Sequence, residues 1–257
     1  MAENLRNKRI GKENYNKYGS LMQIVGYRSN RDVDIYFPEY NWTWYHARYD
    51  KFESGGISCP YDRKVFDIGY IGEGNYRTKL NNKLVQEYVV WYHMLKRCYE
   101  TFNTTTPTYE NCYVCDDWHN YQNFAYWYNN EYYYCRGERI ELDKDILYKG
   151  NKLYSPETCI FAPQRINSLF ISNSNHRGEY PIGVSKAQYG KNKFTASCNI
   201  SKNENVFIGS YKTPEEAFIA YKKFKENLIK QIADEYKGLI PDRLYEAMYN
   251  YEIEITD

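Results

Sequence analysis

The chain has 257 residues, and its 34 basic and 33 acidic side chains leave a formal net charge of +1. This balance excludes a uniformly polycationic protein, so any contact with nucleic acid must come from local patches. No apolar run is long enough to span a bilayer and no signal-peptide pattern follows Met1, which indicates a cytoplasmic protein without a membrane partner and with reduced cysteines.

Residues 1–19 are polar and net basic, and no hydrophobic period runs through them. Five cationic side chains accompany two carboxylates here: Arg6, Lys8, Arg9, Lys12 and Lys17 beside Glu3 and Glu13. We expect a flexible basic tail, with an arm that contacts phosphates as the alternative.

Residues 20–76 carry short runs of strand type. Met22–Tyr27 is followed by a polar turn, Asp32–Phe37 alternates apolar and polar side chains, and Trp42–Tyr45 forms a third run. Alternation with period two is typical of a strand with one buried face. Several short strands in one segment predict a small β-barrel.

Two helices are predicted in the middle of the chain. The first begins near Leu84, where apolar side chains take up helical spacing. The second has Asp116 or Asp117 as its expected cap. Residues 139–161 are turn-rich and strand-like, and we place a domain boundary in the polar linker 173–177.

Three strands are predicted after this linker. They cover Ile182–Lys186, Lys193–Ile200 and Asn205–Tyr211, and turn-forming residues separate them. Short polar turns between strands predict an antiparallel sheet, of which one face is to be covered by the next element.

That next element is a long helix. Thr213 is its predicted cap, Pro214 occupies the first helical position, and Glu216 completes a capping box. An apolar stripe continues to about Lys237 and predicts that the helix packs on the sheet. The other sheet face is left for solvent or for a ligand.

Six elements of this module occur in a recognisable order: Tyr180–Val184, Tyr189–Lys191, Phe194, Ile208–Tyr211, Thr213–Ala217 and Ala220–Tyr221. Together they resemble the APETALA2/ethylene-response-factor DNA-binding domain. The resemblance implies that the sheet lies in the major groove of double-stranded DNA. By position, it assigns the reading face to Ser185, Tyr189, Ser197, Asn199, Asn205 and Phe207, with Lys186, Lys191 and Lys193 close by.

Arginines of that family are replaced here by Ser185, Ala187, Asn199 and Asn205. Losing bidentate guanine contacts predicts weaker discrimination between sequences. Ten lysines and six acidic residues between 181 and 237 give this segment a net charge of +4, which favours attraction to phosphates. Binding of RNA or protein, or a purely structural role, are the alternatives.

A second set of segments lies upstream: Trp91–Tyr99, Val114–Trp118, Phe124, Leu142–Asp145, Gly150–Asn151 and Tyr154–Cys159. They resemble the HNH-related region of phage-encoded homing-type endonucleases, which often precedes an APETALA2-like domain. The resemblance implies an HNH-like region over residues 80–172 and an APETALA2-like domain over residues 178–257.

Catalytic residues of the HNH type are incomplete in this region. Such a nuclease needs a His base and polar ligands that hold a divalent metal against the scissile phosphate. Lys144 stands where the resemblance expects the base, and Thr158, at the expected helix end, replaces an Asn ligand. Asp143 and Asp145 are weak catalytic candidates that, with Asn151, could bind a cation, but we favour a role in holding the turn.

A partial zinc pattern also occurs in this region. Cys112 and Cys115 are separated by two residues and His119 follows, but no second pair has matching spacing. We therefore expect buried free thiols and predict no metal ligand.

The sequence thus predicts an α+β protein: a small β-barrel, a degenerate HNH-like α/β region, and a C-terminal three-stranded antiparallel sheet packed on one long helix. We expect a phage-type DNA-binding protein in the cytoplasm of the host cell, nuclease-like but without catalysis. One alternative is a metal-dependent HNH-family endonuclease, the single case in which Mg²⁺ or another divalent cation is expected as cofactor. The other is a protein that binds and inhibits a host defence factor.

Overall fold

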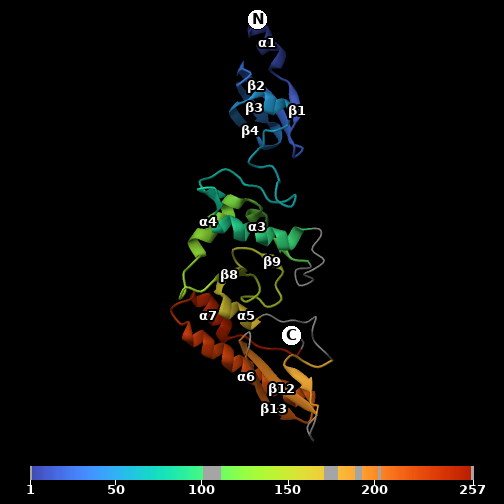
Figure 1. Cartoon of the computed structure of the whole chain (residues 1–257), viewed down its shortest axis with the longest axis vertical. Coiled ribbons are helices and arrows are strands. Elements are labelled where there is room, and N and C mark those ends of the chain that lie inside the picture. Colours follow the sequence, from blue (N-terminus) through green and yellow to red (C-terminus); the bar gives the residue numbers. More distant parts are fainter. Residues whose placement is uncertain (1, 101–110, 171–178, 189–192, 202–203, 256–257) are drawn as a thin grey trace. The chain divides into compact units, whose positions relative to one another are not determined.

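The computed structural model describes residues 2–100, 111–170, 179–188, 193–201 and 204–255. The chain divides into two compact units, Met1–Asn130 and Glu131–Asp257, whose elements are labelled in Figure 1. Helices and antiparallel sheets occur in both units, which confirms the α+β class. The predicted linker at 173–177 lies outside the described residues.

The first unit begins with a four-stranded antiparallel sheet in the order β1-β2-β3-β4. Burial alternates along β3, as the sequence predicts, because every second side chain points into one core. The bounds are Glu13–Tyr15 for β1, Leu21–Ser29 for β2, Asp32–Phe37 for β3 and Trp42–Ala47 for β4.

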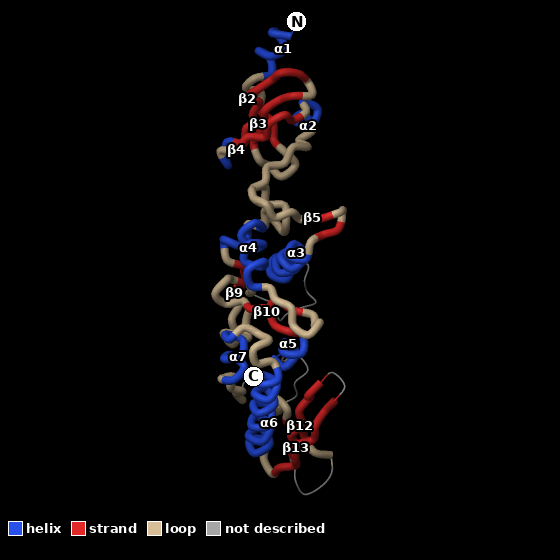
Figure 2. The backbone as a smooth tube through the Cα atoms, turned by 90° about the vertical axis from the view of Figure 1, so that its left-hand side faces the viewer, coloured by secondary structure: helices blue, strands red, loops and turns tan. Residues whose placement is uncertain are grey.

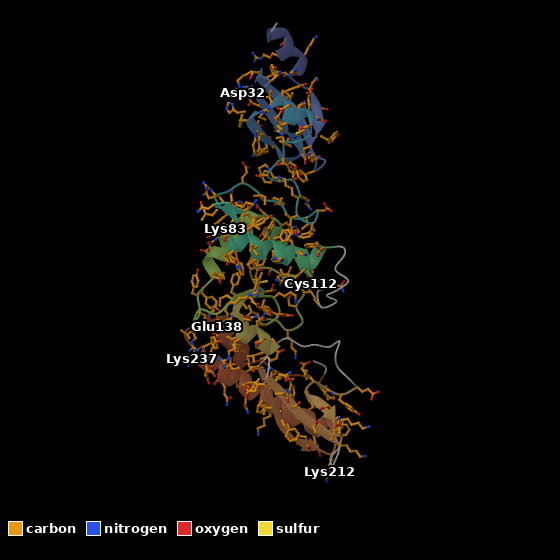
Figure 3. The ribbon with its side chains drawn as sticks, viewed as in Figure 1. Asp32, Lys83, Cys112, Glu138, Lys212 and Lys237 are labelled. Atoms are coloured by element: carbon orange, nitrogen blue, oxygen red, sulfur yellow. The ribbon has the colours of Figure 1, made fainter. Side chains whose placement is uncertain are left out.

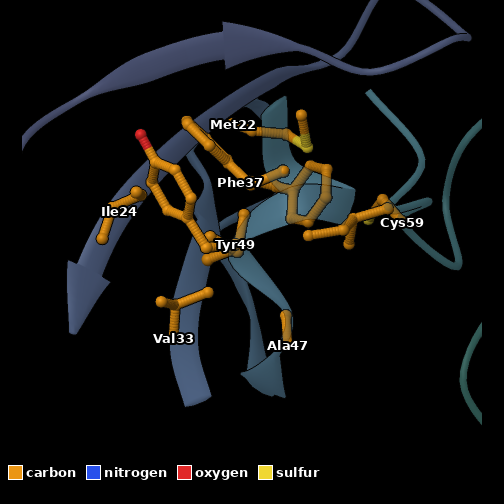
Figure 4. Close-up of a cluster of buried hydrophobic side chains, with 10 residues drawn as sticks. Met22, Ile24, Val33, Phe37, Ala47, Tyr49 and Cys59 are labelled. Carbon is orange, nitrogen blue, oxygen red and sulfur yellow. The ribbon is translucent and has the colours of Figure 1, made fainter. Parts of the chain in front are cut away.

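The predicted barrel is wrong, because the described strands do not close. β1 and β4 are the two edges of an open sheet. The short helix α2, Tyr49–Glu53, covers the inner face instead, and Tyr49 and Phe52 pack with the loop residue Cys59 against the strands. Figure 4 shows this core, in which side chains of β2, β3 and β4 meet Tyr49 and Cys59.

The basic N-terminal segment has secondary structure that the sequence does not predict. Ala2–Arg9 forms α1, and Glu13–Tyr15 pairs with β2. The Arg9 guanidinium lies over the Tyr49 ring, 3.6 Å from its centroid, and Lys12 Nζ donates to the Tyr49 hydroxyl at 3.1 Å. Two of its cations therefore contact Tyr49 of the short helix Tyr49–Glu53.

The rest of the first unit contains a long loop, a short hairpin and two α-helices. A hairpin of β5, Lys79–Leu80, and β6, Lys83–Leu84, precedes α3, Gln86–Tyr99. The predicted helix, expected to start near Leu84, begins two residues later, because Leu84 pairs in the hairpin. The remaining elements are β7, Tyr113–Val114, the 3-10 helix η3, Asp116–His119, and α4, Tyr121–Glu131.

The predicted aspartate cap of the second helix is also wrong. Asp116 and Asp117 lie inside η3, whose N-cap is Cys115, and no side chain caps it. The helix α4 begins only at Tyr121. Trp91 of α3 packs in this region and donates from Nε1 to the carbonyl of Trp118 at 2.7 Å.

The second unit begins with an antiparallel pair of strands, β8 at Ile140–Asp143 and β10 at Ile160–Pro163. The short strand β9, Leu153–Tyr154, lies between them in sequence, and the helix α5, Gln164–Phe170, follows β10. The C-terminal module then adds β11 at Val184–Lys186, β12 at Phe194–Ser201, β13 at Glu204–Tyr211, α6 at Pro214–Glu235 and α7 at Asp242–Tyr249.

The C-terminal module has the predicted architecture. The strands pair antiparallel in the order β11-β12-β13, and Figure 2 shows β12 and β13 next to α6. Thr213 caps α6 by accepting the Glu216 amide at 3.2 Å, and Glu216 accepts the Lys212 amide at 3.0 Å. Ala196 and Cys198 of the sheet pack against the apolar stripe of α6.

The C-terminal end of α6 is anchored on the β8 region of the same unit. Glu235 forms an ion pair with Arg165 of α5 at 2.6 Å, and the Tyr236 hydroxyl donates to Glu138 at 2.5 Å. Through these contacts the module and the β8–α5 segment form one unit. In neither unit does a described helix combine the length and the apolarity that a membrane span requires.

Gly183 allows β11 to approach α6. Its φ of +75° lies in the left-handed region, and a Cβ there would overlap the Tyr221 ring of α6. Gly150 has the same φ of +75° but open space around its Cα, so it is a matched control.

We predict that Gly183→Ala destabilises the second unit by about 2–5 kcal/mol, because backbone strain and overpacking add. Gly150→Ala should cost only the backbone term of about 1–2 kcal/mol. Urea unfolding monitored by circular dichroism measures both values. Equal losses in the two variants would show that the contact with Tyr221 carries no energy.

Candidate nucleic-acid interface

The register of the C-terminal sheet brings its uncharged polar side chains to one face. Ser185 pairs with Thr195, Thr195 with Ser210, Ser197 with Phe207, and Asn199 with Asn205. The alternate residues of β12, Ala196 and Cys198, are buried against α6. We call the opposite side the outer face; it consists of Ser185, Thr195, Ser197, Asn199, Asn205, Phe207 and Ser210.

Polar groups of the outer face bond to one another across the strands. Asn205 Nδ2 donates to Asn199 Oδ1 at 2.6 Å, and the hydroxyls of Ser185 and Thr195 are 3.0 Å apart. Phe207, with 63% of its surface exposed, supplies an apolar side chain amid them. An exposed aromatic ring among polar groups suits contact with a ligand surface better than contact with water.

Lysines flank the outer face. Lys193 precedes Phe194, whose ring packs inward, so Lys193 lies on the same pleat as Thr195. Lys186 pairs with Phe194 and therefore lies on the opposite pleat, at the end of β11. Lys212 is exposed where β13 turns into α6 (Figure 3). Two predicted contact residues, Tyr189 and Lys191, lie outside the described residues.

A groove with a volume of about 1590 Å³ runs beside β11 within the second unit. Its sheet wall includes Ser185, Lys186, Ser197 and Asn199, and cationic side chains outside the sheet line it as well: Arg139, Lys149, Arg165 and Lys225. Several of these cations have protein partners, since Arg165 pairs with Glu235 and Arg139 with Glu141. The groove thus continues past the edge of β11, and its lining holds more cationic than acidic side chains.

The sequence does not predict Thr195 and Ser210 as members of the outer face. Thr195 could have been found, because it stands two residues before Ser197 on the same predicted strand. Ser210 could not, because a β-bulge between Ala196 and Ser197 shifts the register of β13. A bulge of one residue moves the following side chains to the other face.

The two weak catalytic candidates lie at the end of β8. Asp143 Oδ1 accepts the backbone amides of Asp145 and Ile146, both at 2.8 Å, so its carboxylate closes a turn. Burial, and then the charge of Asp145, raises the pKa of Asp143 well above its usual range. Lys144 is buried and donates to Asp145 at 3.0 Å, so it is an ion-pair partner in place of a base.

Asn151 and Thr158 also hold loops in this region. Asn151 Nδ2 donates to the carbonyls of Lys144 and Leu153 at 2.7 and 2.6 Å. Thr158 Oγ1 donates to the Leu153 carbonyl at 2.7 Å. The expected place of Thr158 at a helix end is wrong, because it lies in a turn before β10. These contacts are the ones that a structural role requires.

Within the described residues, one group of His, Cys, Asp or Glu side chains is close enough to share a cation: Asp32, Asp34 and His46 in the first unit. The sequence does not predict this group. The Arg28 guanidinium already bridges both carboxylates, at 2.7 Å from Asp32 and 2.5 Å from Asp34. Cys112, Cys115 and His119 are not brought together as such a group.

Comparisons with protein-family models, with curated proteins and with solved structures find no match for this chain.

We predict that Asp143→Asn keeps the turn, because the amide oxygen can still accept both backbone amides, whereas Asp143→Ala costs about 1–3 kcal/mol of stability. Folding raises the pKa of the Asp143 carboxyl to about 7, so the folded state holds this proton more tightly than the unfolded state does. The resulting contribution to the free energy of unfolding is full below about pH 4 and is lost as the pH rises to about 7. Asp143→Asn should therefore match the wild type in acid and exceed it at about pH 8. Thermal unfolding across this range is the measurement, and an asparagine variant as unstable as the alanine one would contradict it.

Proposed function

We propose that this chain is a DNA-binding protein of the phage type, which holds double-stranded DNA with the outer face of its C-terminal sheet and does not cleave it. The observation that carries the proposal is the register. It gathers five sequence-predicted contact residues on one exposed face, namely Ser185, Ser197, Asn199, Asn205 and Phe207.

The chemistry of this face suits the major groove. A two-stranded ribbon fits there, hydroxyl and amide groups can bond to base edges, and an apolar ring can contact a thymine methyl group. Lys193 and Lys212 are exposed next to the face and provide contacts to phosphates, whereas Lys186 lies on the opposite pleat at the end of β11. The absence of arginine among the seven face residues supports weak sequence discrimination.

The HNH-like region serves as a scaffold in this proposal. Its aspartate is engaged in a turn and its expected base is an ion-paired lysine, Lys144. An ammonium that is held by a carboxylate is a poor acceptor for the proton of an attacking water. Asp143, the other candidate at this turn, accepts two backbone amides, which supports a structural role for its carboxyl group.

Binding to duplex DNA can be tested with matched lysine variants. Lys193→Ala should weaken binding to all sequences and lower the slope of log K against log salt by about 1, because one phosphate contact is lost. Lys223→Ala removes the same charge from the exposed surface of α6, away from the outer face, and should leave the slope unchanged. Fluorescence anisotropy of a labelled duplex, titrated at several salt concentrations, measures both.

The same assay, run with duplexes of different sequence, tests sequence preference. Asn199→Ala should alter the relative affinities of duplexes selected from a random library, while Lys193→Ala should not. If the wild type and a Lys193→Ala, Asn199→Ala, Phe207→Ala triple variant bound duplex DNA with equal affinity, the outer face would be ruled out as the DNA-binding surface.

For catalysis, we expect that purified protein leaves supercoiled plasmid intact in the presence of Mg²⁺ or Mn²⁺. The physical reason is that Lys144 replaces the base and Asp143 is engaged in the turn. Gel electrophoresis of the plasmid is the readout, with a heat-treated sample as control. Nicking that disappears in Asp143→Asn would establish the endonuclease alternative in place of a scaffold.

A further inference from the structure

A hollow with aromatic walls lies on the edge strand of the first unit. It has a volume of about 590 Å³ and is lined by Asn41, Trp42, Thr43, Trp44, Tyr45 and Glu73. The centroids of the Trp42 and Trp44 rings are 5.7 Å apart in an edge-to-face arrangement. Tyr61, whose ring stacks on that of Tyr40, contacts the lining residue Glu73 through a hydrogen bond. Trp44 and Tyr45 are 43% and 65% exposed.

Glu73 is the charged side chain among these lining residues. Trp42 Nε1 donates to its Oε1 and the Tyr61 hydroxyl to its Oε2, each at 2.7 Å. The hydrogen bond from Tyr61, followed by that from Trp42, lowers the pKa of Glu73, so the carboxylate is ionised at neutral pH. No cationic side chain of the described residues contributes to this shift.

Two aromatic donors thus hold a carboxylate in a fixed position beside exposed ring faces. Ring faces and carboxylates both attract cations, and a planar guanidinium can stack on a ring while it donates to a carboxylate. The same charge repels phosphate, which makes nucleic acid an unsuitable occupant.

The backbone of β4 also has a free edge that can pair with another strand. β4 pairs with β3 on one side, and no described strand pairs with its other side. An exposed edge strand offers a row of amide and carbonyl groups to an extended peptide. The hollow lies on this strand, so one peptide can use both features.

We propose that this hollow, defined by Trp42, Trp44, Tyr45 and Glu73, binds an arginine side chain of a partner protein whose extended segment pairs with the free edge of β4. The guanidinium stacks on the indole of Trp44 and donates to Glu73. This site is independent of the outer face and of DNA binding.

The test uses the full chain and a capped peptide, acetyl-Val-Thr-Arg-Val-Thr-amide. The control peptide has citrulline in place of the arginine, a side chain of the same shape without the charge. We expect saturable binding of the arginine peptide, followed by the indole N–H resonances of Trp42 and Trp44. The citrulline peptide should bind about tenfold more weakly or worse, because the cation–π and carboxylate contacts are lost.

Protein variants supply the matched controls. Glu73→Gln should lower the affinity for the arginine peptide by about tenfold. Glu39→Gln removes an equal charge from the adjacent turn η1, Pro38–Tyr40, outside the hollow, and should leave it unchanged. Tyr45→Ser changes an exposed wall without touching the hydrogen bonds of Glu73, so it tests the site even if Glu73→Gln disturbs the fold.

Equal binding of the arginine and citrulline peptides would overturn the proposal. So would wild-type affinity in both Glu73→Gln and Tyr45→Ser. A duplex oligonucleotide that shifts the same indole resonances and displaces the peptide would assign the hollow to nucleic acid instead.

Discussion

The packing of α6 on one face of the C-terminal sheet decides what the other face can do. Ala196 and Cys198 point into the core that Ala217 and Tyr221 of α6 complete. Because successive side chains of a strand alternate, Thr195, Ser197 and Asn199 must point outward. The helix start capped by Thr213 sets where α6 meets the sheet, so the local capping contact and the composition of the outer face are linked.

Much of this module follows from short-range patterns in the sequence. Alternation predicts β12 and β13 nearly to their ends, and the Thr213, Pro214 and Glu216 pattern predicts the start of α6 at the observed residue. Such signals are local, since they arise from pleat geometry and from the unpaired amides of a helix N-terminus. The helix α7 was not predicted, although Pro241 and the spacing of Leu244 and Met248 mark it.

Features that depend on distant contacts could not be predicted. The first sheet stays open because Tyr49 and Phe52 of α2 fill its inner face, and no pattern within the strands encodes that choice. Glu73 meets Trp42 and Tyr61 only after a loop returns to the edge of β4. At the end of β8, the sequence suggests both a metal ligand and a turn for Asp143. The backbone amides of Asp145 and Ile146 favour the turn.

The composition of the outer face limits how sharply it could distinguish bases. A bidentate contact between asparagine and adenine contributes about 1–3 kcal/mol of discrimination. The 2.6 Å bond from Asn205 to Asn199 uses one amide hydrogen and one lone pair, so each side chain keeps a donor and an acceptor for such a contact while the bond fixes its orientation. The outer face has no arginine to add a guanine contact. In the proposed complex, most of the affinity therefore comes from the flanking lysines and from Phe207, whose contacts depend little on sequence.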